Sequence, residues 1–258
     1  MTENWIVPRA GTGCDRAAIQ TAIDTAAAGC GNVWIPQGVW TLDGCLMLPE
    51  SIHVHLDGAH LRRTAAEQKD PWIFCSSRAY DPFANNRVGN QRGIVISGEN
   101  GAVLEGTCGI MLRNVSRFLL EGLTFARCSQ YAVSLAFSYS GKLRNLRFRE
   151  CLGGVECCAG TRDCLFEALG GDVEDALVLF DDERRREMGI YYYGTSWAEA
   201  CYPEDLPLSR GFEIPNTLLK ADGKGYPVTN HILRDVRPDG QGHPYRIKGT
   251  LCRNVLTV

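Results

Sequence analysis

Hydrophobic side chains recur along the middle of the chain at a nearly constant interval of 23 residues. Leu120, Leu143 and Phe166 form one such series. Further series share this interval or one of 22 residues: Leu123, Leu146 and Leu169; Phe125 and Phe148; Cys128 and Cys151; Val133, Val155 and Leu177. A fixed period of this size is typical of a solenoid, in which each coil buries its apolar face against its neighbours. The pattern therefore predicts stacked coils with a long parallel sheet surface, which suits an extended polymer.

The N-terminal part of the chain predicts a helix followed by short strands. Residues 15–28 place Ile19, Ile23 and Ala26 at helical spacing behind Asp15, a good N-cap residue, and glycines follow. Strands are then expected at residues 33–36, 39–42, 52–56 and 58–61, where apolar positions alternate between turn residues. A helix before the first coil is expected to cap the open end of the solenoid, with the cap spanning about residues 11–35.

Two polar segments, about 62–93 and 181–226, interrupt the repeat and are expected to be long loops of one domain spanning residues 1–258. Long insertions in repeat proteins often emerge on the binding face. The chain carries a formal charge of −3, which does not favour a nucleic-acid partner. No apolar run is long enough to span a bilayer, and the start lacks a secretory pattern. These features predict a soluble, cytoplasmic protein without a membrane partner.

The 12 cysteines are scattered and form no C-x-x-C pair, so we expect no metal site. Free cysteine behaves as a small buried hydrophobe, and Cys128 and Cys151 occupy equivalent positions of the repeat. We therefore expect stacked core thiols, as suits a reducing compartment. His53 and His55 share one strand face without a clear third metal ligand.

The N-terminal sequence resembles a known family. Residues 15–26 (DRAAIQTAIDTA), 31–40 (GNVWIPQGVW) and 56–59 (LDGA) resemble the cap and first coil of the pectin-lyase-like right-handed parallel β-helix superfamily. Within it, the chain is most similar to glycoside hydrolase family 28, the polygalacturonases and their relatives. The resemblance implies an all-β, single-stranded right-handed parallel β-helix with an N-terminal capping α-helix, and it implies glycosidic bond hydrolysis.

An acidic segment follows the third repeat, at residues 172–183 (DVEDALVLFDDE). Glycoside hydrolysis needs one carboxyl group as acid and a second as base or nucleophile. If Leu177 and Leu179 face the core, Glu174 and Asp175 lie at the start of that strand, and Asp181, Asp182 and Glu183 lie in the turn after it. The resemblance matches Glu174 and Asp175 to the Asp-Asp pair of polygalacturonases. The alternative interpretation is an ordinary solvated acidic turn.

The other acid of the family has no direct counterpart, because Gly153 stands at the matching position. Glu156 lies slightly further along the same strand, on an outward-facing position, and is the candidate substitute. This departure places the inverting mechanism of the family in doubt for this chain.

Near the C-terminus, Arg246 and Lys248 resemble the Arg-x-Lys motif that contacts substrate carboxylates in polygalacturonases. Alternate strand residues point to one side, so these two cations are expected on one face, where Arg can bind a carboxylate through two hydrogen bonds. Two basic residues alternating along a strand are equally the mark of a solvated face. His231 and His243 are nearby acid–base candidates.

We therefore expect a polygalacturonase-like glycoside hydrolase acting on an acidic or neutral carbohydrate without a cofactor. Asp175 is the expected general acid, Glu174 or Asp182 its partner, Glu156 a further candidate, and Arg246, Lys248 and His243 the substrate contacts. One alternative is a polysaccharide lyase, with Ca²⁺ held by acidic turns. Another is a non-catalytic glycan-binding or spike-like β-helix, which the missing acid at Gly153 favours. A homo-oligomer is left open.

Overall fold

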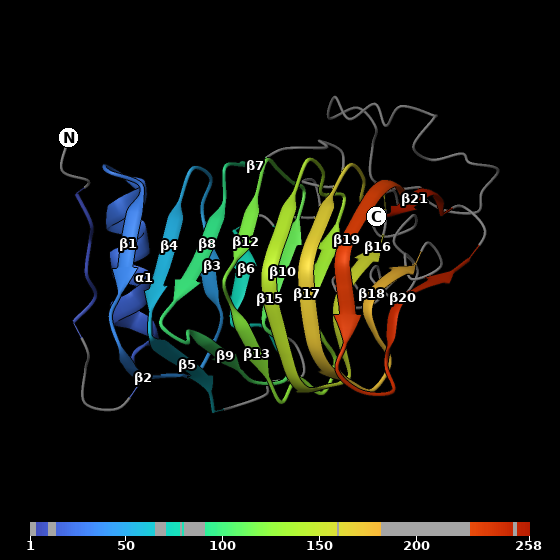
Figure 1. Ribbon diagram of the computed structural model, residues 1–258. Helices are drawn as coiled ribbons and strands as arrows, with labels where there is room; N and C mark the ends of the chain where they lie inside the picture. Colours follow the sequence, from blue (N-terminus) through green and yellow to red (C-terminus); the bar gives the residue numbers. More distant parts are fainter. Residues whose placement is uncertain are drawn as a thin grey trace, which may run out of the picture.

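The computed structural model describes residues 4–9, 14–64, 71–77, 79, 91–158, 160–181, 228–249 and 252–258. The chain winds into a right-handed parallel β-helix whose coils lie side by side from the N-terminal helix to the last strand (Figure 1). All of its strand pairs between named strands are parallel. The fold class predicted from the repeat and the family resemblance is confirmed.

The single helix of the described residues, α1 (Arg16–Ala27), packs against the first coil. Its buried face consists of Ile19, Ala22, Ile23 and Ala26, as the helical spacing predicted. Asp15 stands at the N-cap position, but its side chain makes no capping bond. Instead, the backbone N–H of Thr41 donates to Asp15 Oδ2 at 2.8 Å, which fastens the start of the helix to the first coil. The helix thereby covers the apolar end of the solenoid.

A 12-stranded sheet forms one wall of the solenoid. Its strands are β1 (Asn32–Ile35), β2 (Gly38–Leu42), β4 (His53–Asp57), β5 (Ala59–Arg63), β8 (Val95–Glu99), β9 (Val103–Glu105), β12 (Leu119–Glu121), β13 (Thr124–Ala126), β15 (Lys142–Cys151), β17 (Leu165–Val173), β19 (Thr229–Pro238) and β21 (Arg253–Thr257). The early coils supply two short strands each, whereas β15, β17 and β19 are single long strands that pair along their length.

A 7-stranded sheet forms the opposite wall. Its strands are β3 (Leu46–Leu48), β6 (Phe74–Ser76), β10 (Ile110–Arg113), β14 (Tyr131–Ala136), β16 (Gly153–Cys158), β18 (Ala176–Asp181) and β20 (His243–Lys248). A small third sheet pairs β7 (Gln91–Arg92) with β11 (Val115–Ser116). The core lies between the walls, and its residues are stacked from coil to coil.

The 23-residue register predicted from the sequence is the register of the coils. Leu120 pairs with Leu143, and Leu143 pairs with Phe166. The rings of Phe125 and Phe148 stack with centroids 5.4 Å apart and an angle of 13° between planes. Such columns allow each coil to bury its apolar side chains against apolar side chains at equivalent positions of its neighbours. Cys128 and Cys151 are each 1% exposed, so their predicted place in the core is confirmed.

The second predicted register is correct for one step and wrong for the next. Val133 pairs with Val155, but Val155 pairs with Val178 instead of Leu177. The reason is turn length: one residue separates β15 from β16, whereas Glu174 and Asp175 both separate β17 from β18. The extra residue shifts the following strand by one, so that Leu179 faces outward instead of into the core.

Part of the segment expected to be a loop at 62–93 belongs to the solenoid. β6 pairs with both β3 and β10, and β7 pairs with β11. Pairing with strands on both sides satisfies the backbone of β6, which composition alone did not reveal. The other expected loop, 181–226, lies outside the described residues apart from Asp181, the last residue of β18.

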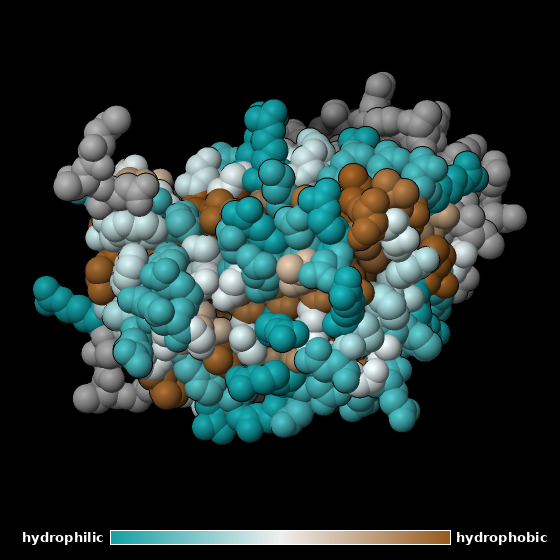
Figure 2. Space-filling view, in the orientation of Figure 1, coloured by the Kyte–Doolittle hydropathy of each residue, from teal (hydrophilic) through white to brown (hydrophobic). Residues whose placement is uncertain are grey.

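The outer face of the 12-stranded sheet is largely hydrophilic, and apolar side chains gather near its C-terminal end (Figure 2). Opposite charges alternate across successive coils on this face. Arg144 Nε lies 2.7 Å from Glu121 Oε1, and Arg234 Nη1 lies 2.9 Å from Glu167 Oε1. Because identical stacking would bring like charges together, this alternation keeps the ladder favourable. No helix of the described part of the chain is long and apolar enough to cross a membrane.

Candidate functional site

One outward-facing column of the 7-stranded sheet changes from apolar to polar along the solenoid. Its members Met111, Ser134, Glu156, Leu179 and Arg246 are in register on β10, β14, β16, β18 and β20. At the N-terminal end, Met111 is buried in an apolar cluster outside the solenoid core. The other buried members of that cluster are Cys45, Trp72, Cys75, Ala79 and Cys108. The sheet is therefore covered over β10, and the polar members of the column follow.

A pocket of about 350 Å³ lies over the polar part of this column. Its lining residues come from four successive coils: Gln130, Tyr131, Leu152, Glu156, Asp175, Leu179, Asp181, Arg246 and Lys248. This volume falls within the range of small-molecule sites, about 300–1,000 Å³. The pocket brings together three carboxyl groups and two cations that are up to 92 residues apart in sequence.

Asp175 is held from two sides. The hydroxyl of Tyr131 donates to Asp175 Oδ2 at 2.6 Å, and Arg246 Nη1 donates to Asp175 Oδ1. Burial alone would raise the pKa of Asp175, but the hydrogen bonds from Tyr131 and Arg246 and the charges of Arg246 and His243 together lower that pKa. Asp175 is thus an oriented, ionised carboxylate, which is the form required of a base or nucleophile.

Tyr131 occupies the space above Gly153, its pair on the next coil. A Cβ atom at position 153 would lie 2.3 Å from Tyr131 Cε1, so no larger side chain fits there while the ring keeps its place. The position at which the family resemblance leads one to expect an acid is therefore filled by an aromatic ring. Burial and then the bond to Asp175 raise the pKa of Tyr131, which keeps its hydroxyl protonated as a donor.

Replacing Gly153 with Ala is expected to lower the free energy of unfolding by about 1–3 kcal/mol, the usual cost of overpacking. The added methyl group must displace the Tyr131 ring. Urea denaturation will measure the loss. Gly29→Ala is the matched control, because the nearest atom to its new Cβ would lie 3.8 Å away. Equal stability of the two variants would contradict the close contact between Tyr131 and Gly153.

The other two carboxyl groups lie on the floor of the pocket. Glu156 and Asp181 are each 2% exposed. The hydroxyl of Ser134 donates to Glu156 Oε2 at 3.4 Å, and Lys248 Nζ lies 3.4 Å from Asp181 Oδ2. Because Asp181 pairs in register with Lys248, the ion pair follows directly from the strand pairing of β18 with β20.

The structure places the residues selected from the sequence in different surroundings. Asp175, Glu156, Arg246 and Lys248 line the pocket, and the two cations share one face of β20 as the alternation predicted. Glu174 is exposed and does not line it. Asp182 lies outside the described residues.

The two histidines near the Arg-x-Lys motif also differ. The backbone N–H of His243 donates to the backbone oxygen of Asp175 at 2.7 Å, so His243 adjoins the site. His231 is 0% exposed and stacks on Phe180 in the core, where burial lowers its pKa to about 4. Its suggested part in acid–base chemistry at the site was wrong, because its ring points into the solenoid.

Sequence reasoning missed two members of the site. Tyr131 carried no signal of its own in the sequence. The only related sign is Gly153 on the next coil, where the Tyr131 ring leaves no room for a side chain. Asp181 was expected in the turn after the strand, but it is the last residue of β18 and faces the pocket. The one-residue shift of this strand, which the period did not reveal, turns Asp181 toward the pocket.

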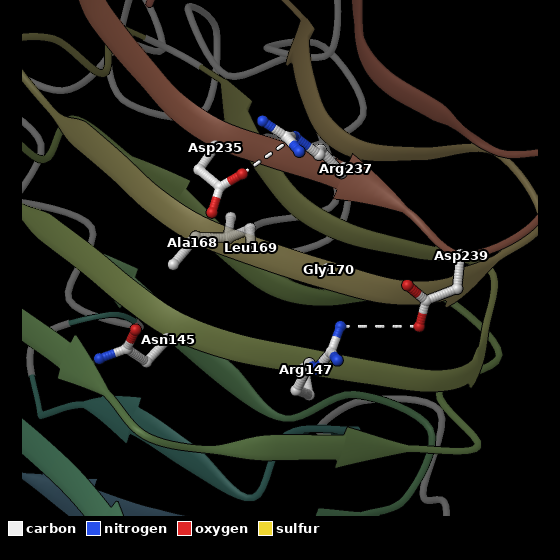
Figure 3. A pocket seen from close by; sticks show the side chains of 8 residues that line it. All are labelled: Asn145, Arg147, Ala168, Leu169, Gly170, Asp235, Arg237 and Asp239. Carbon is white, nitrogen blue, oxygen red and sulfur yellow. Dashed lines mark ion pairs between the residues drawn. The ribbon is translucent and has the colours of Figure 1, made fainter.

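A second pocket of about 400 Å³ lies on the opposite wall, over β15, β17 and β19 (Figure 3). Its charged side chains pair with one another: Arg147 Nη1 lies 3.6 Å from Asp239 Oδ2, and Arg237 Nε lies 3.0 Å from Asp235 Oδ1. These four side chains are more than half exposed, so their ion pairs contribute little to stability. This pocket contains no buried acid and is not our candidate for chemistry. Within the described ranges, no cluster of three or more His, Cys, Asp or Glu side chains is arranged to hold a metal ion.

No protein-family model and no curated protein sequence matches the chain. Solved structures do match in fold. The family 28 exopolygalacturonase of Yersinia enterocolitica has a TM-score of 0.63 at 15% identity, covering 99% of this chain and 54% of that one. The ORF18 protein of Geobacillus virus E2 has a TM-score of 0.63 at 13% identity, covering 97% and 48%. The family GH82 iota-carrageenase of A. fortis has a TM-score of 0.59 at 13% identity, covering 88% and 44%.

The chain thus spans about half the length of these three structures. Identities this low establish the fold and leave the activity to be argued from the pocket. The chain is a right-handed parallel β-helix, similar in fold to a family 28 exopolygalacturonase.

Proposed function

We propose that the protein is a carbohydrate-active enzyme that hydrolyses a glycosidic bond in the pocket between β14 and β20. One observation carries this proposal: carboxyl groups from consecutive coils, Glu156 and Asp175, converge in one pocket beside Arg246 and Lys248. Two carboxyl groups across a sugar-sized pocket are what glycoside hydrolysis requires, without a cofactor. The fold supports the substrate class only by analogy, since an exopolygalacturonase and a carrageenase share it.

In this mechanism Glu156 protonates the leaving oxygen and Asp175 acts as the base or nucleophile. The lowered pKa of Asp175 suits a base or nucleophile and does not suit a proton donor. The sequence predicted Asp175 as the acid. We instead propose Glu156 for this role, because it lies on the buried floor of the pocket. Tyr131 and Arg246 orient the Asp175 carboxylate by their hydrogen bonds.

Incubation with a panel of polysaccharides and oligosaccharides tests the proposal, with new reducing ends and product masses as the readout. Hydrolysis is expected for at least one glycan, and Glu156→Gln is expected to abolish it while the protein stays folded. Glu50→Gln, a substitution of an exposed acid far from the pocket, is the control. Products with an unsaturated ring would instead indicate the lyase reaction.

A second candidate function is glycan binding without turnover. The observation that favours it is the Tyr131 ring above Gly153, which removes the acid that the family resemblance leads one to expect at that position. Binding of a glycan by the wild-type protein, with no product after prolonged incubation, would support this candidate over hydrolysis. Under it, the pocket residues serve as hydrogen-bonding groups for sugar hydroxyls.

A further inference from the structure

We propose that the pocket takes a neutral sugar residue and disfavours a uronic acid, because both of its cations are already paired with carboxylates of the protein. The inference rests on the proposed function and names the substrate class for that site. It departs from what the Arg-x-Lys resemblance implies, namely that Arg246 and Lys248 bind a substrate carboxylate.

The cations are engaged through the strand pairing itself. Arg246 Nη1 contacts Asp175 Oδ1, and Lys248 Nζ lies 3.4 Å from Asp181 Oδ2. Asp181 and Lys248 are direct partners in the pairing of β18 with β20. The Asp181 side chain is only 3% exposed, so it is fixed beside Lys248 and has no room to turn away. A uronate would have to displace carboxylates that belong to the protein itself and stay beside the cations.

The charges of the pocket give the same result. Among the residues that the structure describes, three carboxyl groups (Glu156, Asp175 and Asp181) and two cations (Arg246 and Lys248) line it. With Glu156 protonated, as its part as the proton donor requires, the two remaining carboxylates and the two cations sum to zero. A uronate carboxylate would therefore enter a partly buried site that offers no net positive charge, beside carboxylates that repel it.

The remaining chemistry of the pocket suits a neutral ring. Carboxylate oxygens accept strong hydrogen bonds from sugar hydroxyls, and Gln130 adds an amide that both donates and accepts. Leu152 and Leu179 supply apolar surface for the C–H face of a sugar. Leu179 faces outward and lies between Glu156 and Arg246 in the register of the column. Its apolar side chain therefore separates the buried Glu156 from Arg246, the cation that would attract a uronate if it were unpaired.

Calorimetric titration with paired oligosaccharides tests the inference. Each pair has one backbone in neutral and uronic-acid form: galacto- and galacturono-, gluco- and glucurono-, manno- and mannurono-tetrasaccharides. The neutral member of at least one pair is expected to bind at least about tenfold more tightly than its uronate. Tighter binding of the uronate in every binding pair would overturn the inference and leave the proposed function standing. Absence of binding by both members of all pairs would overturn the proposed function, and the inference with it.

Asp181→Asn provides the second arm, since it frees Lys248. This variant is expected to gain about tenfold in uronate affinity relative to its affinity for the neutral partner. Asp239→Asn is the matched control, because it makes the same change in net charge at the other pocket. No gain in Asp181→Asn would overturn the inference.

A third arm needs no variant, which covers the case in which Asp181→Asn does not fold. For the wild-type protein, the affinity for the uronate is expected not to fall between about 0.02 and 0.3 M NaCl, because the cations that could attract its carboxylate are already paired. A uronate affinity that falls steeply over this range would show that free cations bind it, and it would overturn the inference.

Discussion

Replacing Asp175 by Asn is expected to lower turnover of a glycan substrate by about 10²–10⁴-fold, the usual contribution of a positioned acid or base. Asn keeps an oxygen that can accept the hydrogen bond of Tyr131, so the pocket should retain its shape. Stability should change by about 1 kcal/mol or less, because the Arg246 side of the ion pair is 54% exposed and such pairs contribute little to stability. Initial rates and denaturation midpoints measure both effects.

The informative control for this prediction is Glu174→Gln. The two acids are adjacent in sequence, but Glu174 is exposed and does not line the pocket. Turnover by Glu174→Gln is therefore expected to match the wild type. If Glu174→Gln loses as much activity as Asp175→Asn, the functional surface is the outer side of this turn, and the pocket would be wrongly chosen.

The dependence of the rate on pH provides a separate check on the part played by Arg246. Its hydrogen bond and charge help to lower the pKa of Asp175, so the wild-type base stays ionised well into the acid range. Removing the cation in Arg246→Gln disfavours the ionised form and raises that pKa. The acidic limb of the rate profile is thus expected to move to higher pH. An unmoved acidic limb would mean that Asp175 does not act as the base.

The fold could be predicted from the sequence because every coil of a solenoid carries the same pattern of apolar residues. Leu120, Leu143 and Phe166 recur at one interval, and each recurrence is an independent sign of the same coil. The site was only partly predictable, because its geometry depends on single departures from the repeat. One additional residue in the turn before β18 places Asp175 at the pocket and turns Asp181 outward.

The Tyr131–Gly153 contact illustrates what a period cannot show. In the sequence, Gly153 is a missing acid, and the loss suggested an inactive site. In the structure the same glycine makes room for the Tyr131 ring, whose hydroxyl orients the Asp175 carboxylate on the coil after Gly153. To predict that a side chain on one coil fills the space left by a glycine on the next, one must know which side chains face outward. The apolar repeat specifies only those that face inward.

His231 is expected to make the protein sensitive to acid. Burial lowers its pKa in the folded state to about 4, against an ordinary value of 6.5. Below pH 6.5, His231 is therefore protonated in the unfolded chain but stays neutral in the folded protein, so the free energy of unfolding falls as the pH falls. The loss grows between pH 6.5 and 4 and approaches about 3 kcal/mol at the lower limit.

His231→Phe is the variant that isolates this effect. A phenyl ring keeps the contacts with Phe166 and Phe180, whose centroids lie 5.7 and 4.9 Å from that of His231. The substitution removes the bond from His231 Nε2 to the backbone oxygen of Thr161, 3.2 Å away. That oxygen still accepts a backbone hydrogen bond from Thr229. Stability at pH 7 should therefore change by only about 1 kcal/mol.

Urea denaturation of both proteins at pH 7, 6, 5 and 4 gives the test. Carboxyl groups elsewhere titrate equally in the two proteins, so the difference between their stability curves reports His231 alone. His231→Phe should become progressively more stable relative to the wild type as the pH falls below 6.5. Parallel curves would mean that His231 takes up its proton in the folded state, which is incompatible with a buried neutral ring stacked on Phe180 in the core.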